Sequence, residues 1–165
     1  MIISDENIIK EPNDILRVKC AEVPLPLSDE DRQILEDMLA YVRNSHDEQW
    51  CLDNNCRASV GIAAPQIGIA KRMLAVSIEQ EEGDIEFALV NPRIIANSTR
   101  KAGLENGESC LSVVPDVPGF VPRYYKITVR AYNLLTDQEE IIRLKEYPAV
   151  VLQHEIDHLY GILYH

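Results

Sequence analysis

The sequence predicts an α+β fold in a single compact domain. Two stretches with helical signals, near residues 28–43 and 149–160, flank a middle region of short apolar segments bounded by turn residues. Strands that follow one another, instead of alternating with helices, favour an α+β arrangement over a βαβ series. At 165 residues, of which 46% are hydrophobic, the chain is long enough to bury a core without disulfides.

The first helix is expected to begin after Ser28 and to run to about Arg43. Ser28 is a residue type that caps helix N-termini, and the next three residues are acidic, which suits the positive end of the helix dipole. Apolar residues then recur at helical spacings and form one stripe, which we expect to face the core: Ile34, Leu35, Met38, Leu39 and Val42.

Residues 44–59 are polar and show neither a helical nor a strand period, which predicts a surface loop. We expect His46 to be exposed in this loop. Cys51 and Cys56 lie in the same segment, where a cysteine pair can indicate a second metal site or a disulfide. No pair of histidines accompanies them, and we interpret both as free thiols.

The middle of the chain is expected to form five short strands, of which the last two form a hairpin. Apolar stretches bounded by turn residues predict strands at Met73–Ile78, Phe87–Val90, Ile94–Ala96, Ile127–Leu134 and Ile141–Leu144. Residues 136–138 lie between the last two stretches and have the composition of a tight turn.

The second helix is expected at residues 149–160, with Pro148 in its first turn and Gly161 just beyond its end. Proline near the start and glycine past the end are the usual asymmetry of a helix. We expect the short strands to pack around this helix at the centre of the domain.

The charge of the chain is strongly negative, since 16 basic residues face 27 acidic ones and the net charge is −11. Such a domain lacks the positive field that phosphate binding needs, so direct nucleic-acid binding is not expected. There is no basic stretch followed by a long apolar one at the N-terminus, and no run of roughly 18 apolar residues anywhere. With only four cysteines, these features predict a cytoplasmic protein without a membrane span.

The strongest chemical signal is the H-E-x-x-H sequence at residues 154–158. Residues four apart lie on one face of a helix, so His154 and His158 can bind the same metal ion beside Glu155. The alternative interpretation is two histidines on a solvated or packed helix face. A hydrolytic site needs a third protein ligand and an open position for water. Cys110 upstream and His165 downstream are the candidates.

A third stretch, Ser59 to Gln66, is rich in small residues that allow close backbone approach, and Gln66 offers an amide donor. Taken alone, this stretch is more typical of a tight turn that leads into a strand. A lone cysteine such as Cys110 is likewise more often a small buried apolar residue than a ligand.

Together the three stretches resemble the motifs of peptide deformylases, the enzymes that remove the N-formyl group from nascent polypeptides. That family has a G-Φ-G-Φ-A-A-x-Q loop, an E-G-C-Φ-S turn and an H-E-Φ-D-H helix, in this order. The chain has SVGIAAPQ at 59–66, ESCLS at 108–112 and HEIDH at 154–158, so the resemblance spans essentially its whole length. Because relatives continue beyond the position of His165, we expect residues 1–165 to form a catalytic domain that lacks a C-terminal tail.

The resemblance implies a set of site residues. Cys110, His154 and His158 would bind one divalent metal ion, which lowers the pKa of bound water and polarises a carbonyl. Fe²⁺ is the ion expected from the family, although the same ligands would also accept Zn²⁺, Ni²⁺ or Co²⁺. The catalytic residues would be Glu155 as general acid and base, with the Gln66 amide and the Leu111 backbone N–H as donors to the oxyanion.

The resemblance also implies substrates with an N-formyl-methionine end, which include chains leaving the ribosome. Main-chain groups of Val60 and Gly61 would pair with such a peptide, Glu108 would lie beside it, and Val150 and Val151 would wall the methionine pocket. Packing in the helix core is the alternative role for the two valines. Ribosome contact is left open by the sequence.

Three further positions allow alternative interpretations. Asp157 is either a carboxylate partner of a metal-bound imidazole or the partner of an arginine such as Arg123. Ser59 and Ser109 stand where the family motifs have glycine, and serine would cost on the order of 1 kcal/mol or more if either position needs a positive φ. Two functions compete with deformylation. One is an endopeptidase that does not use Cys110, and the other, suggested by the two serines, is a binding protein without activity.

Overall fold

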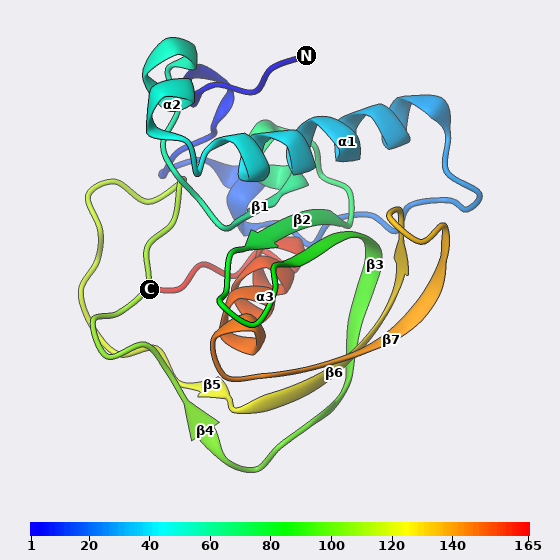
Figure 1. Ribbon diagram of the computed structural model, residues 1–165, viewed down its shortest axis with the longest axis vertical. Coiled ribbons are helices and arrows are strands. Elements are labelled where there is room, and N and C mark those ends of the chain that lie inside the picture. Colours follow the sequence, from blue (N-terminus) through cyan, green and yellow to red (C-terminus); the bar gives the residue numbers. More distant parts are fainter.

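The computed structural model describes residues 1–165 and has five strands in one antiparallel sheet, a two-stranded sheet and three α-helices (Figure 1). The large sheet has the order β1-β2-β3-β6-β7, so β1 and β7 are its edges. Its strands are β1 (Gly61–Ala63), β2 (Met73–Ile78), β3 (Ile85–Asn97), β6 (Lys126–Asn133) and β7 (Gln138–Lys145). The small sheet joins β4 (Lys101–Ala102) to β5 (Arg123–Tyr124).

The helices are α1 (Asp29–Asn44), α2 (Glu48–Asn54) and α3 (Glu146–Leu159), and short 3₁₀ turns lie at Asp5–Asn7, Asp14–Arg17 and Ala64–Ile67. Helices and antiparallel strands thus occur in one small unit, which confirms the α+β class. No helix is long and apolar enough to cross a membrane.

The inner strand β2 lies between β1 and β3 and is buried along its whole length because it is covered on both faces. Successive side chains of a strand point to opposite faces. Met73 and Ala75 accordingly belong to the core cluster that contains the α1 side chains, whereas Leu74 and Val76 belong to the cluster that contains the α3 side chains. The sheet then curves, so that side chains from β6 and β7 also reach the α3 cluster (Figure 1).

The first predicted helix is confirmed as α1. The Ser28 hydroxyl accepts a hydrogen bond from the Asp31 N–H at 3.1 Å and caps the helix. Leu35, Met38 and Val42 are fully buried, so the apolar stripe faces the core as expected.

The surface loop predicted at residues 44–59 is wrong in part, because its middle forms α2. Asp47 caps this helix by accepting hydrogen bonds from the N–H groups of Gln49 and Trp50. The helix has two turns and no buried residue, and its Leu52 side chain is 72% exposed. An apolar stripe is therefore missing, and periodicity could not reveal the helix.

The strands β2, β6 and β7 are confirmed, and β6 and β7 form the predicted hairpin. The two strands predicted at Phe87–Val90 and Ile94–Ala96 are one strand, β3. Its register with β6 shifts between Val90 and Arg93 and again between Ile94 and Ala96. Asn91 has a φ of 53° at the first shift, and its side chain binds the backbone N–H and C=O of Val23. This irregular segment interrupts the alternation that marks a strand.

The second predicted helix is α3, which begins three residues earlier than expected and has Pro148 in its first turn. Gly161 follows its end with a φ of 76°. Most of α3 is buried on every side, and its buried residues include the polar side chains of Gln153, His154, Glu155 and His158. Polar groups in such a helix need partners or a ligand.

Candidate active site

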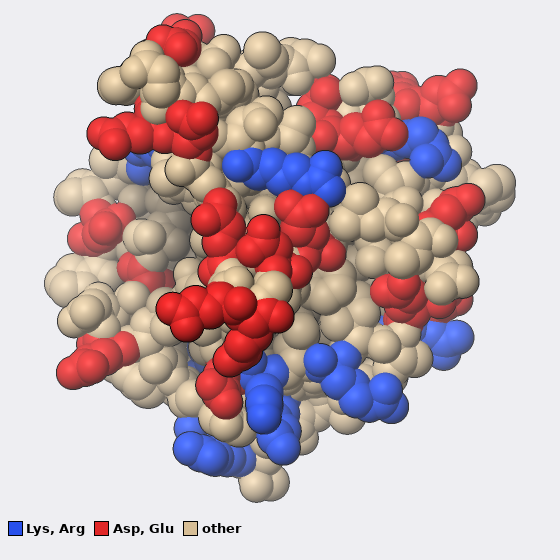
Figure 2. Space-filling model, in the orientation of Figure 1, with Lys and Arg blue, Asp and Glu red and all other residues tan.

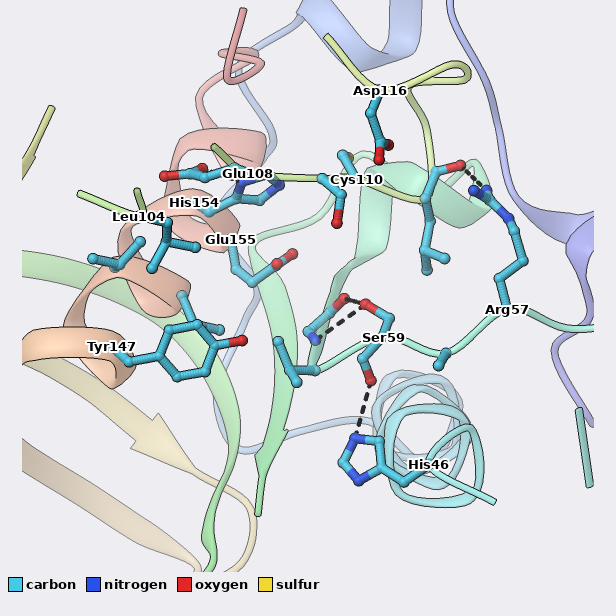
Figure 3. Close-up of a pocket in the computed structure, with 17 residues that line it drawn as sticks. His46, Arg57, Ser59, Leu104, Glu108, Cys110, Asp116, Tyr147, His154 and Glu155 are labelled. Carbon is cyan, nitrogen blue, oxygen red and sulfur yellow. Dashed lines mark hydrogen bonds and ion pairs between the residues drawn. The ribbon is translucent and has the colours of Figure 1, made fainter. Parts of the chain in front are cut away.

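Two segments far apart in the sequence meet the middle of α3. They are the turn at residues 108–113 and the segment from Ser59 to the end of β1 (Figure 3). Cys110, His154 and His158 are all buried here, and one ligand atom of each lies within 4.8 Å of the others. The Cys110 Sγ and the His158 Nε2 are 3.3 Å apart. A thiol and two imidazoles that converge in this way can hold a metal ion.

Cys110 owes its position to a tight turn and to Gln66. The Val113 N–H donates to the Cys110 carbonyl at 3.1 Å, which closes the turn. The Gln66 amide donates to the Cys110 Sγ at 3.4 Å and to the Ser112 hydroxyl at 3.2 Å, while its carbonyl oxygen accepts from the Ala63 N–H at 2.9 Å. Gln66 thereby connects β1 to the turn that carries Cys110.

His154 is oriented by a buried chain of charges. Its Nδ1 lies 2.8 Å from Glu108 Oε1, and Arg123 donates to both oxygens of the same carboxylate at 2.7 and 2.9 Å. A carboxylate only accepts, so Nδ1 carries a proton, and Nε2 is the nitrogen that a metal ion would bind once it displaces the proton there. Arg123 also pairs with Asp157 at 2.6 Å, which settles the two alternatives for Asp157 in favour of the arginine.

The electrostatics of the cluster favour one added positive charge. Burial would raise the pKa of Glu108, but the hydrogen bonds from Arg123 and His154 lower it to about 2. Burial works against a charged His154, yet its hydrogen bonds to Cys110 and Glu108 raise the pKa of His154 to about 10. Burial lowers the pKa of His158 well below its usual range. A neutral imidazole such as His158 has a lone pair that can bind a metal cation.

Glu155 lies on the inner wall of the site, only 5% exposed, and its Oε1 has no hydrogen-bond partner. Burial raises the pKa of Glu155 to about 7. The carboxylate packs directly on Gly61, since a Cβ built there would stand 2.6 Å from Glu155 Oε2. A buried carboxylate with a free oxygen and a pKa near neutrality is equipped to exchange protons with a bound reactant.

A cavity of about 410 Å³ opens beside these groups (Figure 3). Among the residues predicted from the sequence, the following line it: Val60, Gly61, Glu108, Cys110, Leu111, Val150, Val151, His154 and Glu155. Gln66 and His158 are not among the lining residues and lie behind Cys110. The candidate third ligand His165 is outside the cluster and pairs with Glu11.

Sequence reasoning missed much of the outer wall of this cavity, including His46, Arg57, Leu104, Asp116 and Tyr147. The expectation that His46 is exposed is wrong. His46 is half-buried and joins Glu79, at 2.9 Å, to the Ser59 carbonyl, at 3.2 Å. Both partners lie more than ten residues away in the sequence, so no local signal could reveal them.

The two serines in the motifs cause no backbone strain. Neither Ser59 nor Ser109 has a positive φ, and in the turn before Cys110 it is Gly107 that takes the left-handed conformation, with a φ of 81°. Cys51 and Cys56 are free thiols, and the Cys51 thiol donates to the Ser45 carbonyl at 3.4 Å.

Fold and site together define a class of protein, a small α+β domain with a metal-binding group of one cysteine and two histidines beside a buried glutamate. Residues 5–165 match the family model described as polypeptide deformylase. The chain belongs to this family.

Named relatives agree over nearly the full length. The chain is 46% identical to a peptide deformylase of Macrococcus caseolyticus over 167 residues, which covers 99% of this chain and 90% of the relative. It is also 46% identical to peptide deformylase 2 of Geobacillus stearothermophilus, with 99% and 89% covered. A solved class I type b peptide deformylase from Acinetobacter baumannii, with Met-Ala-Ser bound, superposes with a TM-score of 0.76 at 31% identity and covers 99% and 96% of the two chains.

The contact between Gly61 and Glu155 leads to a first prediction. Gly61→Ala places a methyl group against the Glu155 carboxylate, which must move away from the cluster. We expect kcat/KM for a formyl peptide to fall at least about tenfold, as for other displaced catalytic groups.

Gly83→Ala is the control, because its added methyl group meets no atom within 4 Å at the β2–β3 turn. It should keep wild-type activity with some loss of stability, since Gly83 has a φ of 124°. Wild-type kcat/KM in Gly61→Ala would contradict the placement of Glu155.

Proposed function

We propose that residues 1–165 form one catalytic domain in which α3 is the central, metal-binding helix. The chain is a peptide deformylase, an amide hydrolase that removes the N-formyl group from nascent polypeptides and releases formate. The observation that carries the proposed site is the convergence of Cys110, His154 and His158 within 4.8 Å. Glu155 stands beside them with an unpaired oxygen.

The ligands fit one divalent metal ion. A thiolate and two neutral imidazoles leave such an ion a net charge near +1, and Gln66, Glu108 and Arg123 hold the ligands in place. When bound, the ion supplies a Lewis acid that activates water and polarises the formyl carbonyl. The donor set fits Zn²⁺, Ni²⁺ or Co²⁺, and the resemblance to deformylases favours Fe²⁺.

The chain's own residues carry the proton transfers. We assign Glu155 as the base that takes a proton from the attacking water and then returns it to the leaving amine of the peptide. The Leu111 N–H is the donor that we assign to the developing oxyanion. The Gln66 amide would join it only by releasing Ser112 or Cys110, to which its two hydrogens are directed. No acceptor within the chain receives the Leu111 N–H, so that donor is available to a ligand.

The substrate would lie along β1. Gly61 supplies main-chain groups at the edge of the sheet, Val60 lines the cavity beside it, and the buried valines Val150 and Val151 form an apolar wall for a methionine side chain. A related deformylase holds the peptide Met-Ala-Ser, which supports a peptide as the ligand of this chain. Both oxygens of Glu108 are paired, so we assign this residue to the orientation of His154 in place of substrate binding.

The surface supports a peptide substrate over a nucleic acid. Acidic side chains spread over the middle and upper part of the face in Figure 2, and basic ones gather mainly toward its lower part. With a net charge of −11, the protein offers little attraction to phosphates. We therefore propose that it acts on nascent chains in the cytoplasm without binding nucleic acid directly.

The direct test is formate release from formyl-Met-Ala-Ser by protein loaded anaerobically with Fe²⁺, Zn²⁺ or Ni²⁺. Glu155→Gln keeps the shape of the side chain but cannot accept the proton, and we expect kcat to fall at least about 100-fold with bound metal retained. Cys110→Ala should lose both metal and activity.

The competing functions give different results. An endopeptidase that does not use Cys110 would keep metal and peptide cleavage in Cys110→Ala. A binding protein without activity would hold metal and formyl peptide but release no formate under any metal loading. Full turnover by Glu155→Gln would rule out the proposed proton transfers.

Removing the charge that orients His154 should weaken metal binding. Glu108→Gln keeps the size of the side chain but pairs less well with Arg123 and His154, and we expect metal affinity to fall about 10- to 100-fold. Competition with a chelator measures this affinity.

Glu139→Gln is the matched control, because Glu139 also pairs with an arginine, Arg130, at 2.6 Å but on the exposed face of the β6–β7 hairpin. It should leave metal affinity unchanged. Equal affinities in the two variants would show that Glu108 does not support the metal site.

A further inference from the structure

At the edge of β1, the main-chain groups of Gly61 point away from the sheet, and this residue lines the cavity. The Ser77 N–H donates to the Val60 carbonyl at 2.8 Å, so Val60 and Ser77 form a hydrogen-bonded pair. Such pairs alternate with non-bonded ones along an antiparallel ladder. Gly61, opposite Val76, is therefore a non-bonded position, and its N–H and C=O point away from β2 at the edge of the sheet.

The next outward position on β1 is already taken. Ala63 is opposite Leu74 and also points its N–H outward, where the buried Gln66 side chain accepts it at 2.9 Å. Gly61 is thus the residue of β1 at which an extended peptide can add main-chain hydrogen bonds. Addition of a peptide to a strand edge is a common mode of recognition.

In this chain the outward groups of Gly61 are bonded to the Ser59 side chain (Figure 3). The Ser59 hydroxyl donates to the Gly61 carbonyl at 2.7 Å and accepts from the Gly61 N–H at 3.3 Å. One hydroxyl thereby makes the donor and acceptor contacts that a peptide main chain would make at this position.

The backbone of Ser59 is held so that its hydroxyl stays over Gly61. The Ser59 N–H donates to the Ser45 hydroxyl at 3.1 Å, and the Ser45 hydroxyl donates to the Ser59 carbonyl at 3.1 Å. His46 contacts the same carbonyl at 3.2 Å and is itself fixed by Glu79. The side chain can rotate away, but the backbone that carries it is tied down on both sides.

We propose that the Ser59 hydroxyl competes with the substrate main chain for the edge of β1 and so weakens the binding of formyl peptides. The inference rests on the proposed function, because it concerns the same cavity. Since Gly61 packs against Glu155, the competition takes place next to the group assigned to proton transfer. A peptide N–H must displace the hydroxyl or share the Gly61 carbonyl with it, whereas glycine, the residue of the family motif, leaves this edge free.

The test compares KM and kcat for formyl-Met-Ala-Ser in Ser59→Ala, Ser59→Gly and Ser59→Thr with the wild-type values. Loss of one hydrogen bond that competes with binding should lower KM about three- to tenfold in the alanine and glycine variants, with kcat within about twofold. Ser59→Thr keeps the hydroxyl and should keep the wild-type KM. A purely structural role of Ser59 would lower the melting temperature without lowering KM.

An unchanged or higher KM in folded Ser59→Ala and Ser59→Gly would overturn the proposal. The glycine variant keeps the test valid if alanine is poorly tolerated. If the wild-type protein releases no formate, the proposed function fails first, and the affinity for formyl-Met-Ala-Ser by calorimetry then tests Ser59 alone. Tighter binding by Ser59→Ala supports competition, and equal or weaker binding contradicts it.

Discussion

The site depends on the buried contact among Arg123, Glu108 and His154. Arg123 comes from β5, Glu108 from the turn before Cys110, and His154 from the middle of α3, so one carboxylate connects three segments. Both Arg123 and Glu108 are less than a tenth exposed. An unpaired charge at such depth would be costly, and each group is tolerated only because the others are present. The same contact fixes which nitrogen of His154 faces Cys110.

A buried network of this kind contributes more to geometry than to net stability. Stability comes mainly from burial of apolar side chains in the two core clusters that cover the faces of β2. Most of α3 is buried, and the cavity beside Glu155 gives His154 and Glu155 their access to solvent. The ion pair of Glu108 joins α3 to the turn that carries Cys110, and Gln66 joins this turn to β1. The three segments therefore form one rigid unit.

Much of this arrangement could be predicted from local patterns in the sequence. Ser28 and the stripe that follows it predicted α1, and the spacing of His154 and His158 placed two ligands on one helix face. Cys110 was a weak candidate by itself and became the third ligand through the resemblance to deformylase motifs. The family is confirmed, whereas the roles of the individual site residues remain proposals for experiment.

The features that were missed depend on contacts distant in sequence. α2 has no buried face, and β3 has an irregular segment at Asn91 that splits its pattern into two. His46 is held at the cavity wall by its contacts with Glu79 and Ser59, and no pattern around His46 itself indicates either partner. Neither Ser59 nor Ser109 has a positive φ, and in the turn that contains Ser109 the left-handed residue is Gly107.

The central claim is that one metal ion is bound by one sulfur and two imidazole nitrogens. X-ray absorption spectroscopy of protein loaded with one equivalent of Ni²⁺ or Fe²⁺ tests it most directly. We expect a metal–sulfur scattering path that requires Cys110 and two imidazole contributions from His154 and His158. A first coordination shell of nitrogen and oxygen alone, identical in wild-type protein and Cys110→Ser, would contradict it.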